Sequence, residues 1–290
     1  MKITIGSGGE LAYDEAGRGP AVVLVHAGLA DRRMWEPQFA ALAGRHRVIR
    51  YDWRGYGESG DAAGPVSRHE DLLGLLDALG IESAALVGCS YGGAHVLDAA
   101  LAAPGRVTAL GLVCSAISGY EIWTPEMAGL AAQKGSSGIP PERLRAYRDH
   151  TAAVVDPADI AAMAAANVAL MVVGPYRDPA ALDPAVHAQA LKMCAGVFRR
   201  EWAGPAVTET APDRPALGRL AEVRVPVLVV NGTHDLPAVQ DMAGVLADGI
   251  PGARRLDLPA GHLPSLETPG ELTRALLEFL ARAASQPSGA

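Results

Sequence analysis

Six short apolar runs, separated by longer segments with helical spacing, constrain the fold of this chain most. Each run is rich in valine, isoleucine and leucine and is bounded by Gly, Pro or polar residues; the runs are 21–25, 47–51, 84–87, 107–113, 225–230 and 254–258. Such a run predicts a strand that is buried on both faces. Because strands that alternate with helices form βαβ units, we expect an α/β fold with a mostly parallel sheet.

The alternation of strands and helices stops between residues 118 and 218. This stretch carries no strand run, its segments from 141 and over 158–173 have helical character, and Gly and Pro clusters separate them. We expect residues 118–218 to form a helical cap, and residues 1–117 with 219–290 to form the core. The alternative is an extra helical layer that packs on the sheet edge and has no function.

Composition excludes several other classes of protein. The 290 residues carry 25 Lys and Arg against 32 Asp and Glu, without a basic run, which argues against a nucleic-acid partner. The longest nearly unbroken apolar run, 160–173, is too short to span a bilayer, and the N-terminus lacks a secretory pattern. Three scattered cysteines fit neither a disulfide scaffold nor a zinc cluster. We expect a soluble cytoplasmic protein without a metal or a membrane partner.

A serine lies in the turn between a predicted strand and a predicted helix. The segment 88–93, Gly-Cys-Ser-Tyr-Gly-Gly, follows the run 84–87 and opens a helix, which is the context of a nucleophile elbow. Neighbours without side chains allow the strained turn that such a serine occupies. Ser90 is therefore the candidate nucleophile. The alternative is a glycine-rich helix entry that binds an anion.

A serine nucleophile needs a base, and the base needs a carboxylate that fixes its tautomer. Of the eight histidines, His262 comes just after the last strand run, where parallel sheets place functional side chains. Asp235 follows the preceding strand run, and its rivals are Asp52 and Asp257. The chain order of Ser90, Asp235 and His262 matches the triad order of this type of sheet.

The negative charge that develops on an attacked carbonyl needs two backbone donors. The N–H of Tyr91, next to the candidate nucleophile, is one candidate. The second should come from the loop after the run 21–25, where Gly28 is preferred over Leu29. We expect His26 to brace this loop without taking part in proton transfer.

Five segments together resemble the α/β-hydrolase-fold serine hydrolases, the group of lid-containing esterases, lactonases and haloperoxidases. The segments are 25–28, 51–59, 88–93, 232–235, and 260–262 with 267–269. The resemblance implies an eight-stranded, mostly parallel sheet, a helical cap inserted after strand 6, no cofactor, and attack of a serine on a carbonyl carbon. One departure is Ala27, where such hydrolases often carry glycine. The resemblance also implies that Asp52 belongs to a structural turn.

These features predict a hydrolase that cleaves an ester, thioester or lactone of a small, largely apolar organic substrate through an acyl-enzyme. The same triad could instead cleave a carbon–carbon bond or act in a cofactor-free perhydrolase or haloperoxidase-type enzyme. A binding protein that has lost the chemistry is a third hypothesis, against which the complete candidate triad argues. A serine at position 90 argues against epoxide or haloalkane hydrolysis, which uses a carboxylate nucleophile.

The substrate pocket is the least constrained part of the prediction. Apolar side chains from the cap and from the loops near the triad could line it, and we expect Leu29, Trp123, Met171 and Leu263 among them. The expected partner is a small molecule, and the protein is expected to be a monomer or a homodimer.

Overall fold

An eight-stranded sheet runs through the computed structural model, which describes residues 1–62 and 64–285. The strand order across the sheet is β1-β2-β4-β3-β6-β7-β9-β10. β2 pairs antiparallel with β1 and β4, and the other pairs are parallel. The strands are β1 (Lys2–Thr4), β2 (Glu10–Ala16), β3 (Ala21–Val25), β4 (Arg47–Tyr51), β6 (Ala84–Cys89), β7 (Val107–Val113), β9 (Val227–Gly232) and β10 (Arg254–Leu258).

The predicted α/β fold with a mostly parallel sheet is confirmed, since all six apolar runs form strands of this sheet. β9 begins at Val227, two residues later than expected, because Pro226 has no N–H to donate to a neighbouring strand. No apolar run predicts β1 or β2. β2 mixes polar and apolar residues without a regular alternation, lies beside the edge strand, and only Leu11 and Ala12 of it are buried.

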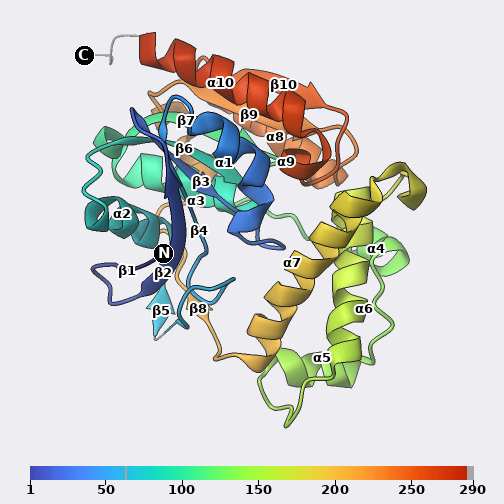
Figure 1. The fold of residues 1–290 in the computed structure, drawn as a ribbon. Coiled ribbons are helices and arrows are strands. Elements are labelled where there is room, and N and C mark those ends of the chain that lie inside the picture. Colours follow the sequence, from blue (N-terminus) through green and yellow to red (C-terminus); the bar gives the residue numbers. More distant parts are fainter. Residues whose placement is uncertain (63, 286–290) are drawn as a thin grey trace.

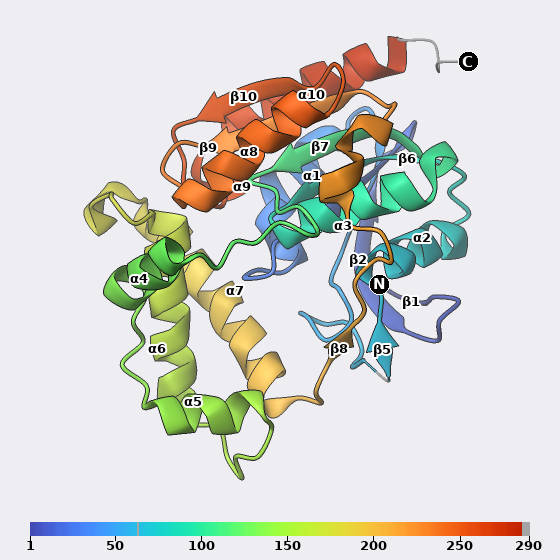
Figure 2. The same ribbon diagram turned by 180° about the vertical axis from the view of Figure 1, so that it is seen from behind.

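Helices cover both faces of the sheet. On one face lie α1 (Glu36–Leu42) and α10 (Pro269–Ser285), in front of the sheet in Figure 1. The opposite face, seen in Figure 2, carries α2 (Arg68–Ala78), α3 (Tyr91–Ala102) and α8 (Pro237–Gly249). The sheet is thus buried between two helical layers, which explains why its central strands are apolar on both faces.

Register aligns the carboxyl ends of the parallel strands at one edge. Gly88 of β6 pairs with Val25 of β3 and with Leu112 of β7, and Gly232 of β9 pairs with Leu258 of β10. Loops that leave this edge therefore come close together although they are far apart in sequence. In open parallel sheets this edge is where ligands bind.

Four helices between β7 and β9 form a group of their own to one side of the sheet (Figure 1). They pack partly around a small separate cluster of buried side chains, in which Tyr147 stacks on Trp202 with ring centroids 4.9 Å apart. The helices are α4 (Pro125–Lys134), α5 (Pro141–Arg148), α6 (Pro157–Asn167), which continues as a π-helical segment (Val168–Val173), and α7 (Pro184–Ala203). Because β7 is the sixth strand of the sheet in chain order, the insertion lies where the resemblance implies. That residues 118–218 act as a cap over the core 1–117 and 219–290 stays a prediction.

The expectation of no strand within 118–218 is wrong at one short element. β8 (Thr208–Glu209) pairs parallel with β5 (Pro65–Val66). Both residues of β8 are polar and exposed, so the sequence gives no signal for a strand there. The pairing depends on contacts with other segments, including the ion pair of Glu209 with Arg68. The remaining short elements are the helix α9 (Pro264–Glu267) and the 3₁₀ turns Arg32–Trp35, Pro104–Arg106, Pro179–Ala181 and Ala216–Glu222.

Among the described residues, no helix has both the length and the apolar character needed to cross a bilayer.

Candidate active site

Ser90 occupies the sharp turn between β6 and α3. Its backbone has φ 56° and ψ −125°, a left-handed conformation that costs a non-glycine residue free energy. Two backbone hydrogen bonds hold the turn against the end of β7: Ser90 N donates to Val113 O (3.0 Å), and Ala116 N donates to Ser90 O (3.0 Å). The structure therefore has the elbow geometry that the sequence predicts for this segment.

Gly88 and Gly92, each two residues from Ser90, must be glycines because backbone atoms of neighbouring segments lie very close to them. A Cβ on Gly88 would lie 2.2 Å from the carbonyl oxygen of Gly92, and a Cβ on Gly92 would lie 2.3 Å from that of His26. A side chain at either position would push the first turn of α3 away from the ends of β6 and β3.

Asp235 and His262 are hydrogen-bonded at the same edge of the sheet. Asp235 follows β9 and His262 follows β10, and both side chains are buried. His262 Nδ1 lies 2.6 Å from Asp235 Oδ2, while Asp235 Oδ1 accepts the N–H of Leu236 at 2.7 Å. A carboxylate can only accept at this distance, so Nδ1 carries the proton and Nε2 of the neutral ring is left as an acceptor.

The elbow and the His262 loop are in direct contact. The thiol of Cys89, the residue before Ser90, donates to the carbonyl oxygen of His262 at 3.5 Å. His262 Nε2 is buried and has no hydrogen-bond partner in the part of the chain that the structure describes. A buried, unpaired imidazole nitrogen beside a serine turn is available to accept a hydroxyl proton.

Cys114 completes a small buried cluster with the Asp–His pair. One ligand atom from each of Cys114, Asp235 and His262 lies within 4.8 Å of the others, a spacing that could hold a metal ion. However, burial and the nearby Asp235 carboxylate raise the pKa of the Cys114 thiol well above its usual value. A protonated thiol is a poor metal ligand, and a metal would have to replace the hydrogen bond between Asp235 and His262.

The loop after β3 reaches the first turn of α3. A Cβ on Gly28 would lie 3.1 Å from the Tyr91 ring. Within the described residues, neither the N–H of Gly28 nor that of Tyr91 donates a hydrogen bond. Two free N–H groups on facing segments are what an oxyanion hole needs, and the first N–H groups of a helix have no partner within the helix.

His26 holds the base of this loop, as expected. Its Nδ1 is 2.9 Å from Ala27 O, and its Nε2 accepts the N–H of Trp53 at 3.2 Å, so the ring bridges the loops after β3 and β4. The ring also stacks on Trp53, with centroids 4.2 Å apart. Burial lowers the pKa of His26, so the ring stays neutral.

The two rival acids lie in other surroundings. Asp52 is buried after β4 and accepts the N–H groups of Arg32 (2.8 Å) and Glu58 (2.9 Å) besides pairing with the Arg32 guanidinium. Asp257 is exposed on β10 and accepts a hydrogen bond from Asn231 at 2.7 Å. Among the described residues, neither forms a hydrogen bond or ion pair with a histidine, so Asp235 is the carboxylate that the structure brings to His262.

The four expected pocket residues differ in exposure. Leu29 and Leu263 are buried, and Leu263 has no accessible surface at all. Met171 is partly buried against the main core, whereas Trp123 exposes 63% of its surface. Their role in binding substrate stays a prediction.

A network that sequence reasoning missed connects the insertion 118–218 to the His262 loop. Met171 O accepts the N–H of His262 at 3.1 Å, and Glu267 accepts the N–H of Gly261 at 2.9 Å while pairing with Arg177. The segment 267–269 contributes to the resemblance, but Arg177 is 90 residues away from Glu267 and no local pattern marks it.

Comparisons with known proteins identify the fold. A family model described as the alpha/beta hydrolase fold matches residues 20–269. The enol-lactonase from Burkholderia xenovorans LB400 is a similar solved structure, with a TM-score of 0.70, 27% identity, and coverage of 97% of this chain and 100% of that chain.

Two curated relatives match most of this chain. A dihydrolipoyllysine-residue acetyltransferase component of an acetoin cleaving system from Pseudomonas putida is 31% identical over 90% of this chain and 64% of its own length. A carboxylesterase from Bacillus subtilis (strain 168) is 27% identical over 90% of this chain and 80% of its own length. The chain spans 33–64% of the length of the first curated relatives that it matches. The family match covers most of the described sheet and the segments that carry Ser90, Asp235 and His262, and the chain is thus an enzyme of the α/β hydrolase fold family.

Proposed function

We propose that this enzyme is a serine hydrolase with Ser90 as nucleophile, His262 as base and Asp235 as the acid of the triad. It cleaves an ester, thioester or lactone bond of a small, largely apolar organic substrate. The observation that carries the proposal is the buried hydrogen bond between Asp235 and His262 beside the strained turn of Ser90.

Acylation uses the unpaired imidazole nitrogen. His262 Nε2 takes the proton of the Ser90 hydroxyl while Oγ attacks the carbonyl carbon, and Asp235 stabilises the imidazolium that forms. The N–H groups of Gly28 and Tyr91 stabilise the charge that develops on the carbonyl oxygen. The tetrahedral intermediate collapses when His262 returns the proton to the leaving alcohol, thiol or lactone oxygen.

Deacylation repeats the same proton transfers with water in place of serine. His262 removes a proton from water, the hydroxide attacks the acyl carbon, and Ser90 leaves as the free hydroxyl. The acid is released and the neutral imidazole is restored, so the cycle needs no group beyond these side chains and water.

The bond class is supported by the relatives rather than by the substrate pocket. An enol-lactonase and a carboxylesterase share the fold over 90% or more of this chain. Enol-lactones and carboxylic esters present the same reacting group, a carbonyl carbon bonded to a leaving oxygen. The family's epoxide hydrolases do not fit as well, because position 90 carries a hydroxyl and not a carboxylate.

The proposal is tested with a fluorophosphonate and a substrate panel. We expect the fluorophosphonate to modify Ser90, and Ser90→Ala to lower kcat by about 10⁴–10⁶ while the circular dichroism spectrum stays unchanged. The matched control is Ser136→Ala, at an exposed serine of the cap, which should keep full activity. The panel contains p-nitrophenyl esters of increasing chain length, a thioester and a lactone. Ser90→Ala activity within tenfold of wild type would rule the proposal out.

A further inference from the structure

The backbone that carries the candidate base lies beyond the paired part of the sheet. The pairing of β10 with β9 ends at Leu258, so other contacts hold the N–H groups of Gly261 and His262. Gly261 N donates to Glu267 Oε2 at 2.9 Å. His262 N donates to Met171 O at 3.1 Å. One acceptor lies in α9 and the other in the insertion, so the position of the imidazole depends on both.

Arg177 of the insertion connects these two acceptors. Its Nη1 pairs with Glu267. Its Nε donates to Val173 O at 2.8 Å and its Nη2 to Val172 O at 3.2 Å, which are the two carbonyls that follow that of Met171. The last carbonyls of a helix have no partner within the helix, and an arginine side chain can satisfy them. Arg177 thus holds the end of the π-helical segment and the Glu267 carboxylate at once.

The hydrogen bonds close into a ring around the base loop. The ring runs from Gly261 through Glu267, Arg177 and the end of the π-helical segment to His262, the residue that follows Gly261. The side chains of Arg177 and Glu267 are only 12% and 11% exposed. A charge-assisted pair that is shielded from water is stronger and more directional than an exposed one. Loss of either member should therefore displace the loop.

The end of the π-helical segment also packs against the loop that carries the candidate acid. Gly174 directly follows this segment with φ 96°, and a Cβ there would lie 2.1 Å from the carbonyl oxygen of His234. His234 immediately precedes Asp235. Together with the hydrogen bond from His262 N, this contact places one end of the insertion against both loops of the Asp–His pair.

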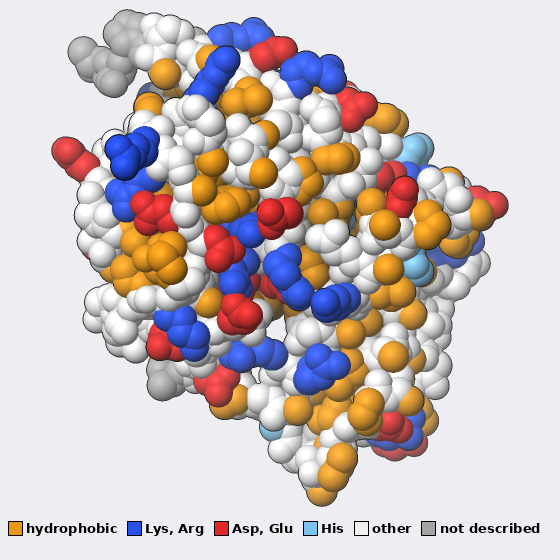
Figure 3. All heavy atoms as spheres, viewed as in Figure 1, with side chains coloured by type: hydrophobic (Ala, Val, Ile, Leu, Met, Phe, Trp, Pro, Cys, Tyr) orange, Lys and Arg blue, Asp and Glu red, His pale blue; other side chains and the backbone are white. Residues whose placement is uncertain are grey.

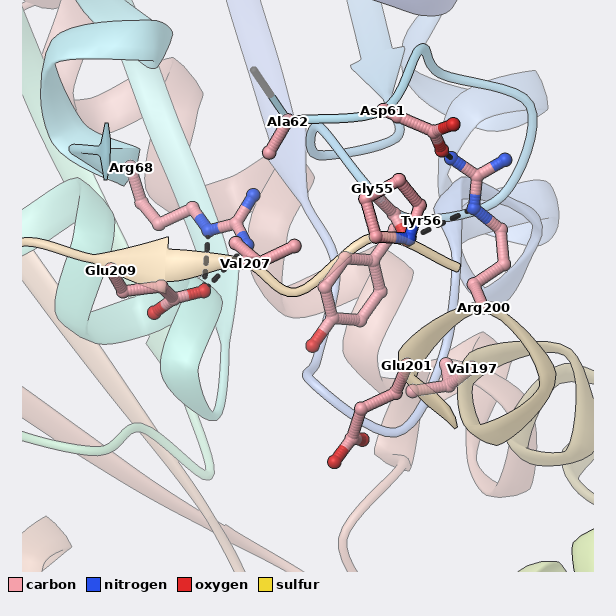
Figure 4. A pocket seen from close by; sticks show the side chains of 11 residues that line it. Gly55, Tyr56, Asp61, Ala62, Arg68, Val197, Arg200, Glu201, Val207 and Glu209 are labelled. Carbon is pink, nitrogen blue, oxygen red and sulfur yellow. Dashed lines mark hydrogen bonds and ion pairs between the residues drawn. The ribbon is translucent and has the colours of Figure 1, made fainter. Parts of the chain in front are cut away.

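A second arginine of the insertion contacts the core at a different place. Figure 3 shows a hollow between the sheet layers and the insertion, with charged side chains of both signs around it. In the last turn of α7, Arg200 pairs with Asp61 at 2.8 Å and donates to Gly55 O at 3.1 Å (Figure 4). This contact borders a cavity of about 290 Å³, which Tyr56 and Glu201 also line. None of the described residues that line the cavity belongs to the candidate triad, so Arg200 is a matched control for Arg177.

We propose that Arg177 is a positioning residue for the candidate base. It acts through Glu267 and the end of the π-helical segment on the backbone that carries His262. The inference rests on the proposed function, because it concerns the base that serves Ser90. A misplacement of about 1 Å in a catalytic group can lower the rate by about a hundredfold, so an arginine that never touches the substrate can control turnover.

Proton NMR tests the inference without any substrate. The Nδ1 proton of His262 lies in a hydrogen bond of 2.6 Å to Asp235 and should give a resonance far downfield. We expect Arg177→Gln to shift or broaden this resonance, because glutamine has neither the charge nor the planar fork that reaches Glu267 and two carbonyls together. Arg200→Gln should leave the resonance unchanged.

Kinetics distinguishes positioning from substrate binding. Arg177→Gln should lower kcat on p-nitrophenyl esters by about ten- to a hundredfold with KM nearly unchanged, because the side chain acts on the base and not on the substrate. The rate constant for fluorophosphonate labelling of Ser90 should fall by a similar factor. Arg177→Lys keeps the charge but not the fork and should recover part of the loss. Arg200→Gln should keep the wild-type kcat.

Glu267 provides a second, independent variant. Its two carboxylate oxygens face two donors, Gly261 N–H and the Arg177 guanidinium. Glu267→Gln would turn its NH₂ group toward one of them and should reproduce the effects of Arg177→Gln. Because both residues belong to one ring, the double variant should lose less than the product of the two single losses.

Two outcomes would overturn the inference, and a third concerns the function beneath it. An unchanged downfield resonance and an unchanged kcat in Arg177→Gln exclude the positioning role and leave the serine hydrolase intact. Equal losses in Arg177→Gln and Arg200→Gln, matched by equal losses of stability in urea, would show a general effect of attaching the insertion. If wild-type Ser90 is not labelled, the proposed nucleophile is wrong, while the NMR comparison still decides the role of Arg177. Should Arg177→Gln not fold, the same comparisons apply to Arg177→Lys and Glu267→Gln.

Discussion

The thiol of Cys89 donates to the backbone carbonyl of His262 across 3.5 Å, so the cysteine beside the candidate nucleophile is a structural contact of the base loop. Burial raises the pKa of this thiol well above its usual value. The thiolate is the reactive form of cysteine, and Cys89 should therefore be inert in the folded protein. We expect iodoacetamide to leave activity unchanged and to modify all three cysteines only after unfolding, as measured by mass spectrometry. Inactivation that substrate prevents would contradict this assignment.

Asp235→Asn should lower kcat by about 10²–10⁴ without unfolding the protein. The reason lies in the two bonds of this carboxylate. Because Leu236 N–H donates to Oδ1, an asparagine would keep its carbonyl oxygen there and turn its NH₂ group toward His262. Nδ1 would then have to accept, and the ring proton would move to Nε2, where it blocks the base.

The control for this variant is Asp257→Asn, which changes an exposed carboxylate on the neighbouring strand. Hydrolysis of a p-nitrophenyl ester at saturating substrate measures both. Equal losses in the two variants would show that charge near β10, and not the tautomer of His262, determines the rate.

Asp52→Asn should act on stability and not on chemistry. The side chain is fully buried, accepts the N–H groups of Arg32 and Glu58, and pairs with the Arg32 guanidinium. Asparagine lacks the charge and one acceptor oxygen of this network, and Arg32 keeps only Asp14 and Glu58 of the described residues as ion-pair partners, at a cost of about 1–3 kcal/mol in the free energy of unfolding.

Urea unfolding measures that loss, with Asp241→Asn at an exposed position of α8 as control. The fluorophosphonate labelling rate of Asp52→Asn should stay near that of wild type. A large fall in labelling at unchanged stability would place the triad acid after β4 and refute the assignment of Asp235.

His95 should make the fold sensitive to acid. Burial, and secondarily the charge of Arg68, lower the pKa of His95 in the folded protein to about 3, and its Nε2 has no partner among the described residues. Between pH 6.5 and pH 3 the unfolded chain binds a proton that the folded protein does not. The free energy of unfolding should therefore be fully retained above pH 6.5 and fall by about 1.4 kcal/mol per pH unit below it.

Urea unfolding at several pH values measures this slope. His95→Gln should flatten it, whereas His187→Gln, at a half-buried position of α7, should not. Part of the slope should remain in His95→Gln, because burial also lowers the pKa of His26. An unchanged slope in His95→Gln would show that other groups govern acid unfolding.

The sheet and the Asp–His pair could be predicted because each leaves a local signature. Strands buried on both faces are continuous apolar runs, and Asp235 and His262 each directly follow one of them. β2 and β8 leave no such signature, since one lies beside the edge strand and the other is exposed.

Contacts that join distant segments could not be predicted in the same way. Cys114 comes close to Asp235 only because β7 and β9 are neighbours in the sheet, and Glu201 lines a cavity with Tyr56 only because α7 returns to the loop after β4. In sequence these residues have ordinary surroundings. Their roles depend on tertiary packing, which composition and periodicity do not encode.

The hydrogen bond from His262 N–H to Met171 O fixes one end of the insertion 118–218 to the loop that carries the candidate base. A Cβ on Gly261 would lie 2.1 Å from Val172 O. The backbone of the π-helical segment 168–173 therefore packs closely against the loop that carries the imidazole. If the insertion moves as a lid, a displacement of this end would also displace His262. We therefore expect any such motion to be confined to the part of the insertion around α5. The position of the candidate base is therefore set partly by the insertion and not by the sheet alone.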